Sequence, residues 1–236
     1  MGRIRWVRCL VSPVEGFRAW AAEAPSVASS LRGLFAWRLP LALLQAWLSG
    51  RAALALLAQF RDPGSDLWRE AMTRAGAAGF LEDLRTFLES LPAVPAWERF
   101  WPWLLPLVPV GLLGLWLHDA AWDHAGLWLL RGLRKDGAVR ATLAAEAVAL
   151  TVGTAGVAIA LLALLPGVSL VFSLVAWPLG AYLWLLRGVA LAAFHGCPTW
   201  KGVVATILHL VLFLAFACCL LAAAVVLALA IVGSAS

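Results

Sequence analysis

The sequence predicts an all-α, polytopic transmembrane bundle of five helices. Hydrophobic residues make up 63% of the 236 residues and charged residues only 13%, whereas soluble domains carry about 25% charged residues. Five apolar runs are long enough to cross a hydrocarbon core, which takes about 20 helical residues. Lipid offers the backbone no hydrogen bonds, so runs of this kind are expected to be helices. The composition therefore excludes an ordinary soluble enzyme.

The expected spans divide the chain into an N-terminal segment and a membrane domain. Residues 1–38 are expected to be a cytoplasmic amphipathic segment, because Phe17 and Trp20 are three residues apart opposite Arg18. This short helix either lies in the membrane interface or packs on the bundle as a cap. Residues 39–233 are expected to hold the five helices. The predicted spans are residues 39–60, 101–122, 141–165, 168–194 and 203–232.

The main polar stretch of the chain lies between the first two spans. Within it, Phe80, Leu84 and Phe87 recur at helical spacing, with acidic and basic residues on the opposite face. Pro92 and Pro95 are expected to end this helix. The pattern predicts an amphipathic helical hairpin over residues 64–92, lying on the outer membrane surface.

The distribution of basic residues predicts the orientation. Lysine and arginine concentrate before the first span and between the second and third spans, and the C-terminus has none. Under the positive-inside rule the N-terminus is expected in the cytoplasm and the C-terminus outside. The net charge of +5 comes from basic residues that flank the spans, where they set the orientation. Nucleic acid is therefore not an expected partner. The basic set between spans two and three is also expected to attract anionic lipid headgroups. It comprises Arg131, Arg134, Lys135 and Arg140.

Several short motifs follow one another in a recognisable order along the chain. Pro13 and Phe17 come first, and the sequence triplets His124-Ala125-Gly126 and Arg140-Ala141-Thr142 flank the loop after the second span. The later motifs are Arg131-Gly132, Leu165-Pro166-Gly167, Trp177, Leu186-Arg187-Gly188, Phe194-His195-Gly196 and Trp200-Lys201-Gly202. In this order the sequence resembles the Yip family of Ypt/Rab-interacting, five-helix membrane proteins, over roughly residues 11–224.

The resemblance implies a fold and a mode of action. Known Yip members act by recruiting and organising partners, so membrane lipids, other membrane proteins or further copies of this chain are the expected partners. The alanine- and tryptophan-rich composition is typical of a bacterial-type member, for which the expected location is the bacterial cytoplasmic membrane.

Polar residues inside the apolar runs are candidate functional residues, because a central arginine costs about 2.5–3.5 kcal/mol on insertion scales. Arg51, Glu146, Asp119 and His209 are expected to form an intramembrane polar cluster. Its functional interpretation is a polar site or permeation path, with Arg51 paired with Glu146 or Asp119. The structural interpretation is a hydrogen-bonded cluster with Arg51 snorkelling outward. The structural interpretation is favoured.

A metal site is a weaker hypothesis for the end of the second span. Asp119 and Asp123 are one helical turn apart and are flanked by His118 and His124. An ordinary polar helix end explains the same residues, so no metal and no other cofactor is expected. The sequence also lacks the zinc-protease, phosphate-loop and serine-hydrolase motifs.

Together these patterns favour a non-catalytic integral membrane protein. We expect a scaffold, assembly or trafficking-type partner for other membrane proteins or lipids, and not an enzyme. The alternative is a small channel, transporter or lipid-moving protein that uses the polar cluster around Arg51 and Glu146.

Overall fold

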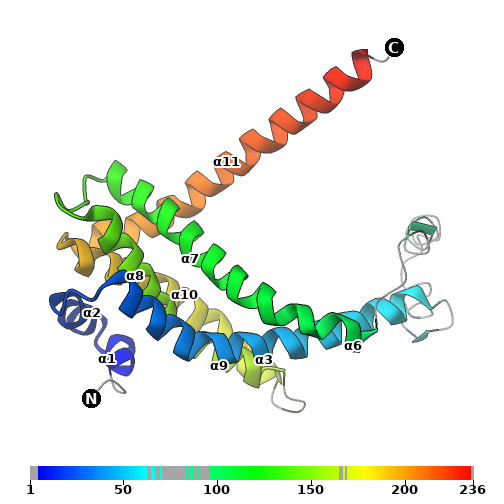
Figure 1. Ribbon diagram of the computed structural model, residues 1–236, viewed down its shortest axis with the longest axis horizontal. Coiled ribbons are helices and arrows are strands. Elements are labelled where there is room, and N and C mark those ends of the chain that lie inside the picture. The colour runs from blue at the N-terminus through cyan, green and yellow to red at the C-terminus, as the bar shows by residue number, and fades with distance from the viewer. Residues whose placement is uncertain are drawn as a thin grey trace. The chain divides into compact units, whose positions relative to one another are not determined.

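The structure is a computed structural model that describes residues 5–62, 65–66, 70, 83, 86–87, 90, 96–164, 167 and 169–234. Every regular element in these ranges is helical (Figure 1). The helices are α1 (Arg5–Val11), α2 (Pro13–Ala22), α3 (Val27–Arg61), α6 (Trp97–Phe100), the 3₁₀ turn η2 (Trp101–Trp103), α7 (Leu104–Leu129), α8 (Ala138–Val152), α9 (Thr154–Leu162), α10 (Ser169–His195) and α11 (Thr199–Ser234).

Five stretches of the described chain are long and apolar enough to cross a membrane. They are Val27–Phe60, Trp97–Leu129, Ala138–Leu162, Ser169–His195 and Thr199–Leu221. The predicted fold class is confirmed, and the protein is an integral membrane protein. Most of the hairpin predicted at residues 64–92 lies outside the described residues.

The first span starts earlier than its apolar run. The backbone N–H of Ser29 donates to the Ser26 hydroxyl at 3.1 Å, and the N–H of Ser30 donates to the Ser26 carbonyl at 3.0 Å. A serine that accepts these bonds caps a helix N-terminus, so α3 begins at Val27 instead of Leu39. Pro40 then lies inside the helix.

Glycines in the left-handed region set two of the helix boundaries. Gly137 precedes α8 with φ 64°, and Gly196 follows α10 with φ 66°. Residues with a β-carbon rarely adopt this conformation. Gly137 therefore marks where α8 begins, and Gly196 marks where α10 ends.

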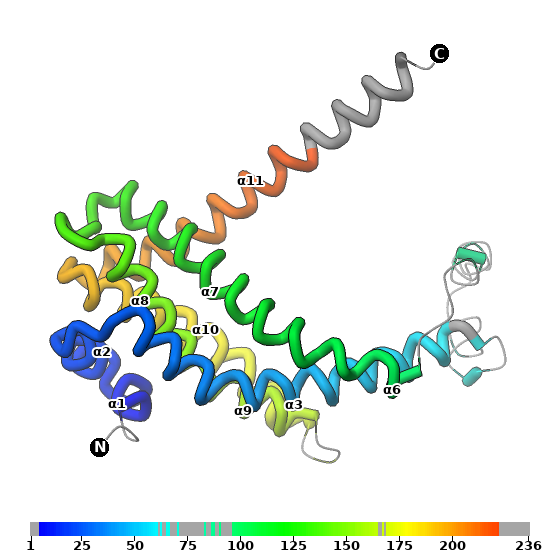
Figure 2. The backbone as a smooth tube through the Cα atoms, in the orientation of Figure 1, coloured from blue at the N-terminus to red at the C-terminus, as the bar shows by residue number. Residues whose placement is uncertain are grey.

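The chain divides into two compact units, residues 1–41 with 111–236 and residues 42–110. We call them unit 1 and unit 2. In unit 1, α8 is the most enclosed span, and α10 packs along α2, α8, α9 and α11. The tube in Figure 2 follows α1 and α2 as two short consecutive helices at the N-terminal end of this unit.

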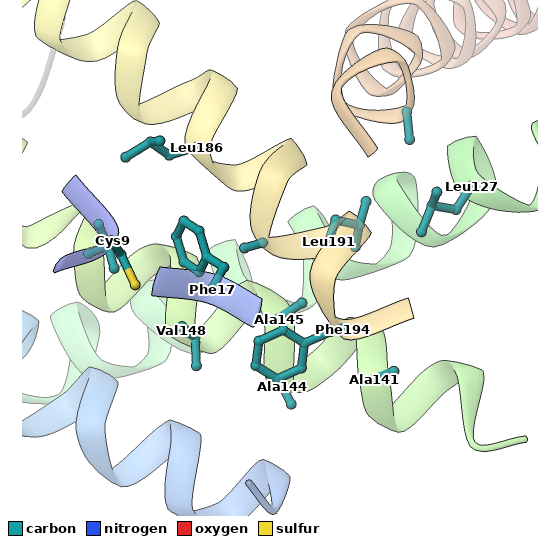
Figure 3. Close-up of a cluster of buried hydrophobic side chains, with 13 residues drawn as sticks. Cys9, Phe17, Leu127, Ala141, Ala144, Ala145, Val148, Leu186, Leu191 and Phe194 are labelled. Atoms are coloured by element: carbon teal, nitrogen blue, oxygen red, sulfur yellow. The ribbon is translucent and has the colours of Figure 1, made fainter. Parts of the chain in front are cut away.

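The apolar core of unit 1 joins the N-terminal helices to the membrane helices. Phe17 and Cys9 are fully buried against a set from α7, α8 and α10 that includes Val148, Leu191 and Leu127 (Figure 3). The Tyr182 hydroxyl on α10 also donates to the Leu10 carbonyl. The amphipathic segment is therefore a cap packed on the bundle, which was one of the two arrangements predicted for it.

Helices α10 and α11 cross with almost no space between their backbones. A β-carbon added to Gly202 would lie 2.0 Å from the Gly188 carbonyl oxygen, and one added to Gly188 would lie 2.6 Å from the Cα of Val203. Small residues at a crossing allow this approach. The crossing fixes the start of α11, and with it His209, beside α10.

Unit 2 is held by aromatic side chains. Trp47 on α3 and Trp97 on α6 meet edge to face with ring centroids 5.9 Å apart, and Trp97 packs on Phe100 at 5.8 Å. Gly50 leaves room for the Trp97 ring, because a β-carbon there would approach it to 3.2 Å. Such aromatic pairs add about 0.5–1.5 kcal/mol each beyond their buried area.

Candidate functional site: a buried charge cluster in unit 1

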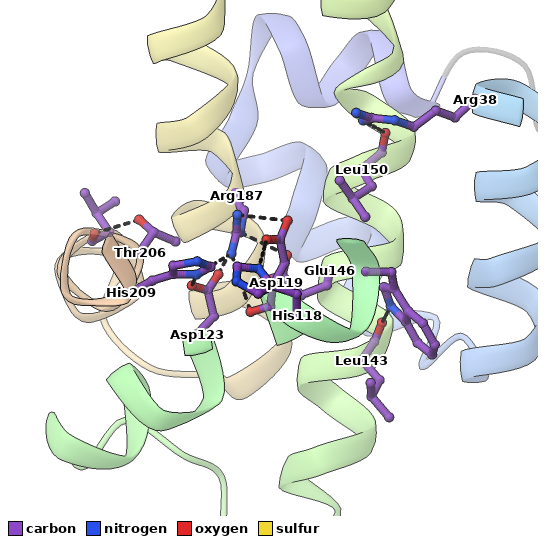
Figure 4. A network of polar contacts seen from close by, with 12 residues as sticks. Arg38, His118, Asp119, Asp123, Leu143, Glu146, Leu150, Arg187, Thr206 and His209 are labelled. Atoms are coloured by element: carbon purple, nitrogen blue, oxygen red, sulfur yellow. Dashed lines mark hydrogen bonds and ion pairs between the residues drawn. The ribbon is translucent and has the colours of Figure 1, made fainter. Parts of the chain in front are cut away.

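Four spans of unit 1 each contribute charged or titratable residues to one buried cluster. Helix α7 supplies His118, Asp119 and Asp123, because residues one turn apart share a helix face. Glu146 comes from α8, Arg187 from α10 and His209 from α11. Figure 4 shows these side chains converging, with Arg187 among the carboxylates. We call this set the charge cluster.

The guanidinium of Arg187 connects the three acidic residues. Its Nε lies 2.7 Å from Asp123 Oδ2 and 3.0 Å from Glu146 Oε2, and its Nη1 lies 3.0 Å from Asp119 Oδ2. The Arg187 side chain is 11% exposed, and those of Asp123 and Glu146 are 0% exposed. These ion pairs are therefore shielded from solvent, where attraction between charges is strongest and desolvation costs most.

Glu146 is close to Arg187 but lacks a hydrogen bond. The single Nε hydrogen of Arg187 is directed at Asp123, and neither Glu146 oxygen has a hydrogen-bond partner. The 3.0 Å approach of Oε2 to Nε therefore supplies charge attraction without a donated proton. A buried polar atom in this position costs about 1–3 kcal/mol, and more when it is charged.

The charge cluster carries more negative than positive charge. Three carboxylates contact one guanidinium, an excess of two negative charges within these ion pairs when the histidines are neutral, and the positive charge of Arg38 on α3 acts on Asp119 as well. Isolated charges in a low-dielectric interior are expensive, so such groups are paired, protonated or bound to a cation. The arrangement can therefore take up cations in the middle of a membrane protein.

His209 is oriented by two neighbours at once. Its Nδ1 lies 2.8 Å from Asp123 Oδ1 and 2.8 Å from Arg187 Nη2. One nitrogen of a neutral ring either donates or accepts. When Nδ1 carries the proton it donates to the Asp123 carboxylate, and the lone pair then belongs to Nε2.

A second polar group links the same helices nearer to their ends. The Arg134 backbone N–H donates to His195 Nδ1 at 3.2 Å, so the His195 proton belongs on Nε2, which lies 3.0 Å from Thr142 Oγ1. Thr142 Oγ1 also lies 2.9 Å from His124 Nδ1 and 3.2 Å from the Ala138 carbonyl. This histidine–threonine group joins α7, α8 and α10, so polar contacts tie these spans together in two successive layers.

The predicted intramembrane residues are distributed over both units. Glu146, Asp119 and His209 lie together in the charge cluster. Arg51 belongs to unit 2 and is exposed, with its guanidinium 5.8 Å from the centroid of the Trp47 ring. The expectation that Arg51 is buried is therefore wrong, whereas its pairing with Glu146 or Asp119, which belong to unit 1, stays a prediction. Helix α3 has no acidic residue, so Arg51 stacks on the aromatic ring one turn before it.

The four weak metal candidates separate into two environments. His118 Nδ1 lies 3.2 Å from Asp119 Oδ1, and Asp123 contacts Arg187 and His209. His124 faces Thr142 instead. Potential ligand atoms of His118, Asp119 and His209 lie within 4.8 Å of one another.

The four basic residues predicted to bind headgroups are all exposed, three of them in the turn between α7 and α8 and Arg140 in the first turn of α8. Arg134 and Arg140 line a pocket of about 570 Å³, with Asp136 and Gly137 beside them and Ala141, Ala144 and Phe194 forming its apolar wall. Arg18 and Arg134 line a second pocket of about 430 Å³ that shares Ala21 and Phe194 with the first. Lys201 donates to the Arg131 carbonyl at 3.1 Å.

The central residue, Arg187, was not among the predicted intramembrane residues and was named only within the motif Leu186-Arg187-Gly188. A usable signal was present: Arg187 is followed by eight residues of helix up to His195, about 12 Å along the helix axis. That depth is too great for an interfacial residue. Arg38, one residue before the predicted first span, lies inside α3 and donates to the Leu150 carbonyl at 3.0 Å.

Comparison with known proteins adds no family to this picture. No family model, no curated protein and no solved structure matches the chain.

Proposed function

We propose that this protein is a non-catalytic membrane scaffold that binds anionic lipid headgroups and, through them, organises other membrane proteins. The observation that carries the proposal is the pocket that Arg134 and Arg140 line together with an apolar wall. A phospholipid offers the matching chemistry, because a phosphate suits the guanidinium groups and the upper acyl chains suit the apolar wall.

The charge balance around this pocket supports an anionic ligand. The turn and the start of α8 together carry Arg131, Arg134, Lys135 and Arg140 against the single acid Asp136. Helix α8 has no acidic residue in its first turn and no side-chain cap. Its free N–H groups add partial positive charge near Arg140. Each basic residue near an anionic leaflet contributes about 1 kcal/mol of attraction.

The proposed orientation places this pocket on the cytoplasmic side, with the N-terminus inside and the C-terminus outside. The basic-residue asymmetry supports it. Single cysteines introduced at Ser12, Ser90 and Ser234 test it with an impermeant thiol reagent. We expect labelling from outside at Ser90 and Ser234 only, and labelling at Ser12 from outside would reverse the orientation.

The resemblance to the Yip family supports the same class of function. Of the residues that carry it, Gly188 packs against Gly202, and His195 lies beside Thr142. We therefore propose a bacterial-type Yip protein of the bacterial cytoplasmic membrane, whose partners are lipids, other membrane proteins or further copies of itself.

Native mass spectrometry of the purified protein tests the lipid proposal. We expect phosphatidylglycerol or cardiolipin to stay bound in preference to phosphatidylcholine, and the double substitution Arg134→Ala with Arg140→Ala to remove that preference. The control is Arg51→Ala with Arg99→Ala, which removes two exposed arginines of unit 2. Equal anionic-lipid retention in both double variants would contradict the proposal.

A second candidate function is a small transporter or channel, favoured by the charge cluster within the spans. It predicts ion flux or lipid scrambling by the protein in liposomes, lost in Glu146→Ala. The scaffold proposal predicts rates equal to those of protein-free liposomes.

A further inference from the structure

We propose that the charge cluster binds one divalent transition-metal ion through His118, Asp119 and His209. This goes beyond the scaffold function and does not depend on it. Ligand atoms of the three residues lie within 4.8 Å of one another. Ligands about 2.0–2.2 Å from an ion are at most about 4.4 Å apart. Closing the site therefore takes only small side-chain adjustments.

The hydrogen bonds around Asp119 leave one oxygen for the ion. Asp119 Oδ2 is occupied by Arg187 Nη1 at 3.0 Å, whereas Oδ1 faces His118 at 3.2 Å. Arg187 thus fixes the carboxylate and directs its other oxygen toward the two imidazoles. The His118 and His209 rings meet edge to face with centroids 5.2 Å apart.

Asp123 orients His209 in the way that outer carboxylates orient metal-bound histidines. Its Oδ1 lies 2.8 Å from His209 Nδ1. A metal-ligating histidine usually donates its other N–H to a carboxylate, which fixes the tautomer and raises the basicity of the ligand nitrogen. The proposal requires Nδ1 to donate to Asp123 and not to accept from Arg187 Nη2, which also lies 2.8 Å away; the Nε2 lone pair of His209 is then available to the ion.

Glu146 supplies an independent sign that the cluster is built for a cation. It is fully buried, and as an ionised carboxylate it accepts no hydrogen bond, while its carboxyl group lies beside that of Asp123. Within the ion pairs, three carboxylates and one guanidinium leave an excess of two negative charges, which one divalent ion would offset beside the charge of Arg38 that also acts on Asp119. A protonated carboxyl pair would offset part of the same charge, so the experiment must separate the two.

Ligand type and access narrow the class of ion. Two imidazoles and one carboxylate suit zinc, iron, manganese or cobalt better than calcium or magnesium, which prefer oxygen ligands. The His118 side chain is 39% exposed, so protein does not enclose the site on this side. Trp122 and Phe213 pack edge to face near His118 and form an apolar wall.

Zinc content and cobalt spectra of the chelator-treated protein in nanodiscs test the proposal. We expect about one Zn²⁺ per chain after dialysis, and a visible Co²⁺ absorption band that Zn²⁺ removes. His118→Ala should lose both without disturbing the contacts of Arg187. Asp123→Asn should weaken binding about 10–100-fold, as loss of an outer-shell partner does.

His124→Ala is the matched control, because it removes a histidine of the same helix that faces Thr142 and should keep the ion. As a second readout, Zn²⁺ should raise the unfolding temperature of the native protein and of His124→Ala, but not that of His118→Ala. Equal binding by His118→Ala and the native protein would overturn the proposal. So would absence of bound metal together with an infrared band of a protonated carboxyl that Glu146→Gln removes, since protons would then neutralise the cluster.

Discussion

Units 1 and 2 each contain an arginine within a candidate span, and the two arginines have opposite surroundings. Arg187 in unit 1 is 11% exposed and faces three carboxylates. Arg51 in unit 2 is exposed and lies over Trp47. An arginine side chain is thus buried where other spans place carboxylates beside it. It is exposed where the neighbouring group on its own helix is an aromatic ring. The residues on the neighbouring helices therefore determine the surroundings of each arginine.

Replacing each arginine gives the largest expected difference between the units. Arg187→Met leaves the carboxylates of the charge cluster uncompensated, and breaking a buried ion pair costs about 3–5 kcal/mol of unfolding free energy. Arg51→Met should change it by about 0.5 kcal/mol or less, as surface substitutions do. Unfolding in detergent, followed by circular dichroism against denaturant, measures both. Equal losses would remove the distinction.

The helix crossing in unit 1 gives the next largest effect. Gly202→Ala places a β-carbon against the Gly188 carbonyl and should cost about 1–3 kcal/mol, as overpacking does. The control is Gly114→Ala in α7, where an added β-carbon meets nothing within 4 Å. It should be neutral or slightly stabilising, because alanine favours the helix by about 1 kcal/mol over glycine. A destabilised Gly114→Ala alongside a tolerated Gly202→Ala would contradict the described packing.

The smallest effect is a difference in thiol reactivity at the N-terminal cap. Burial raises the pKa of the Cys9 thiol to about 11, with Arg8 opposing the shift. The reactive thiolate is therefore scarce at neutral pH, and alkylation should accelerate as pH rises toward that pKa. Gly16→Ala would force Cys9 and α2 apart, because its β-carbon would lie 2.9 Å from the Cys9 Cα.

Maleimide labelling of a variant with Cys9 as its only cysteine measures the reactivity of the Cys9 thiol. We expect slow labelling at pH 7 and faster labelling after Gly16→Ala. Rapid labelling of Cys9 without that substitution would show that the cap is not packed on α10.

The spans were predictable because crossing lipid requires about 20 apolar helical residues, and such runs are visible in one dimension. The residues at which helices begin were less predictable, since the start of α3 depends on the Ser26 cap and not on the apolar run. In the site, Glu146, Asp119 and His209 could be found as polar residues in apolar runs. To identify Arg187, and not Arg51, as the partner of these acids requires the contacts between α7, α8 and α10. The spacing of residues along one helix does not contain that information.

The central claim is that Arg187 balances the carboxylates of the charge cluster, and a double-mutant cycle between Arg187→Met and Glu146→Leu tests it most directly. Removing Glu146 after Arg187 takes away one uncompensated negative charge. The double variant should therefore unfold at a higher denaturant concentration than Arg187→Met alone, with a coupling of about 0.5–3 kcal/mol. Losses that simply add, leaving the double variant the least stable of the series, would contradict the account.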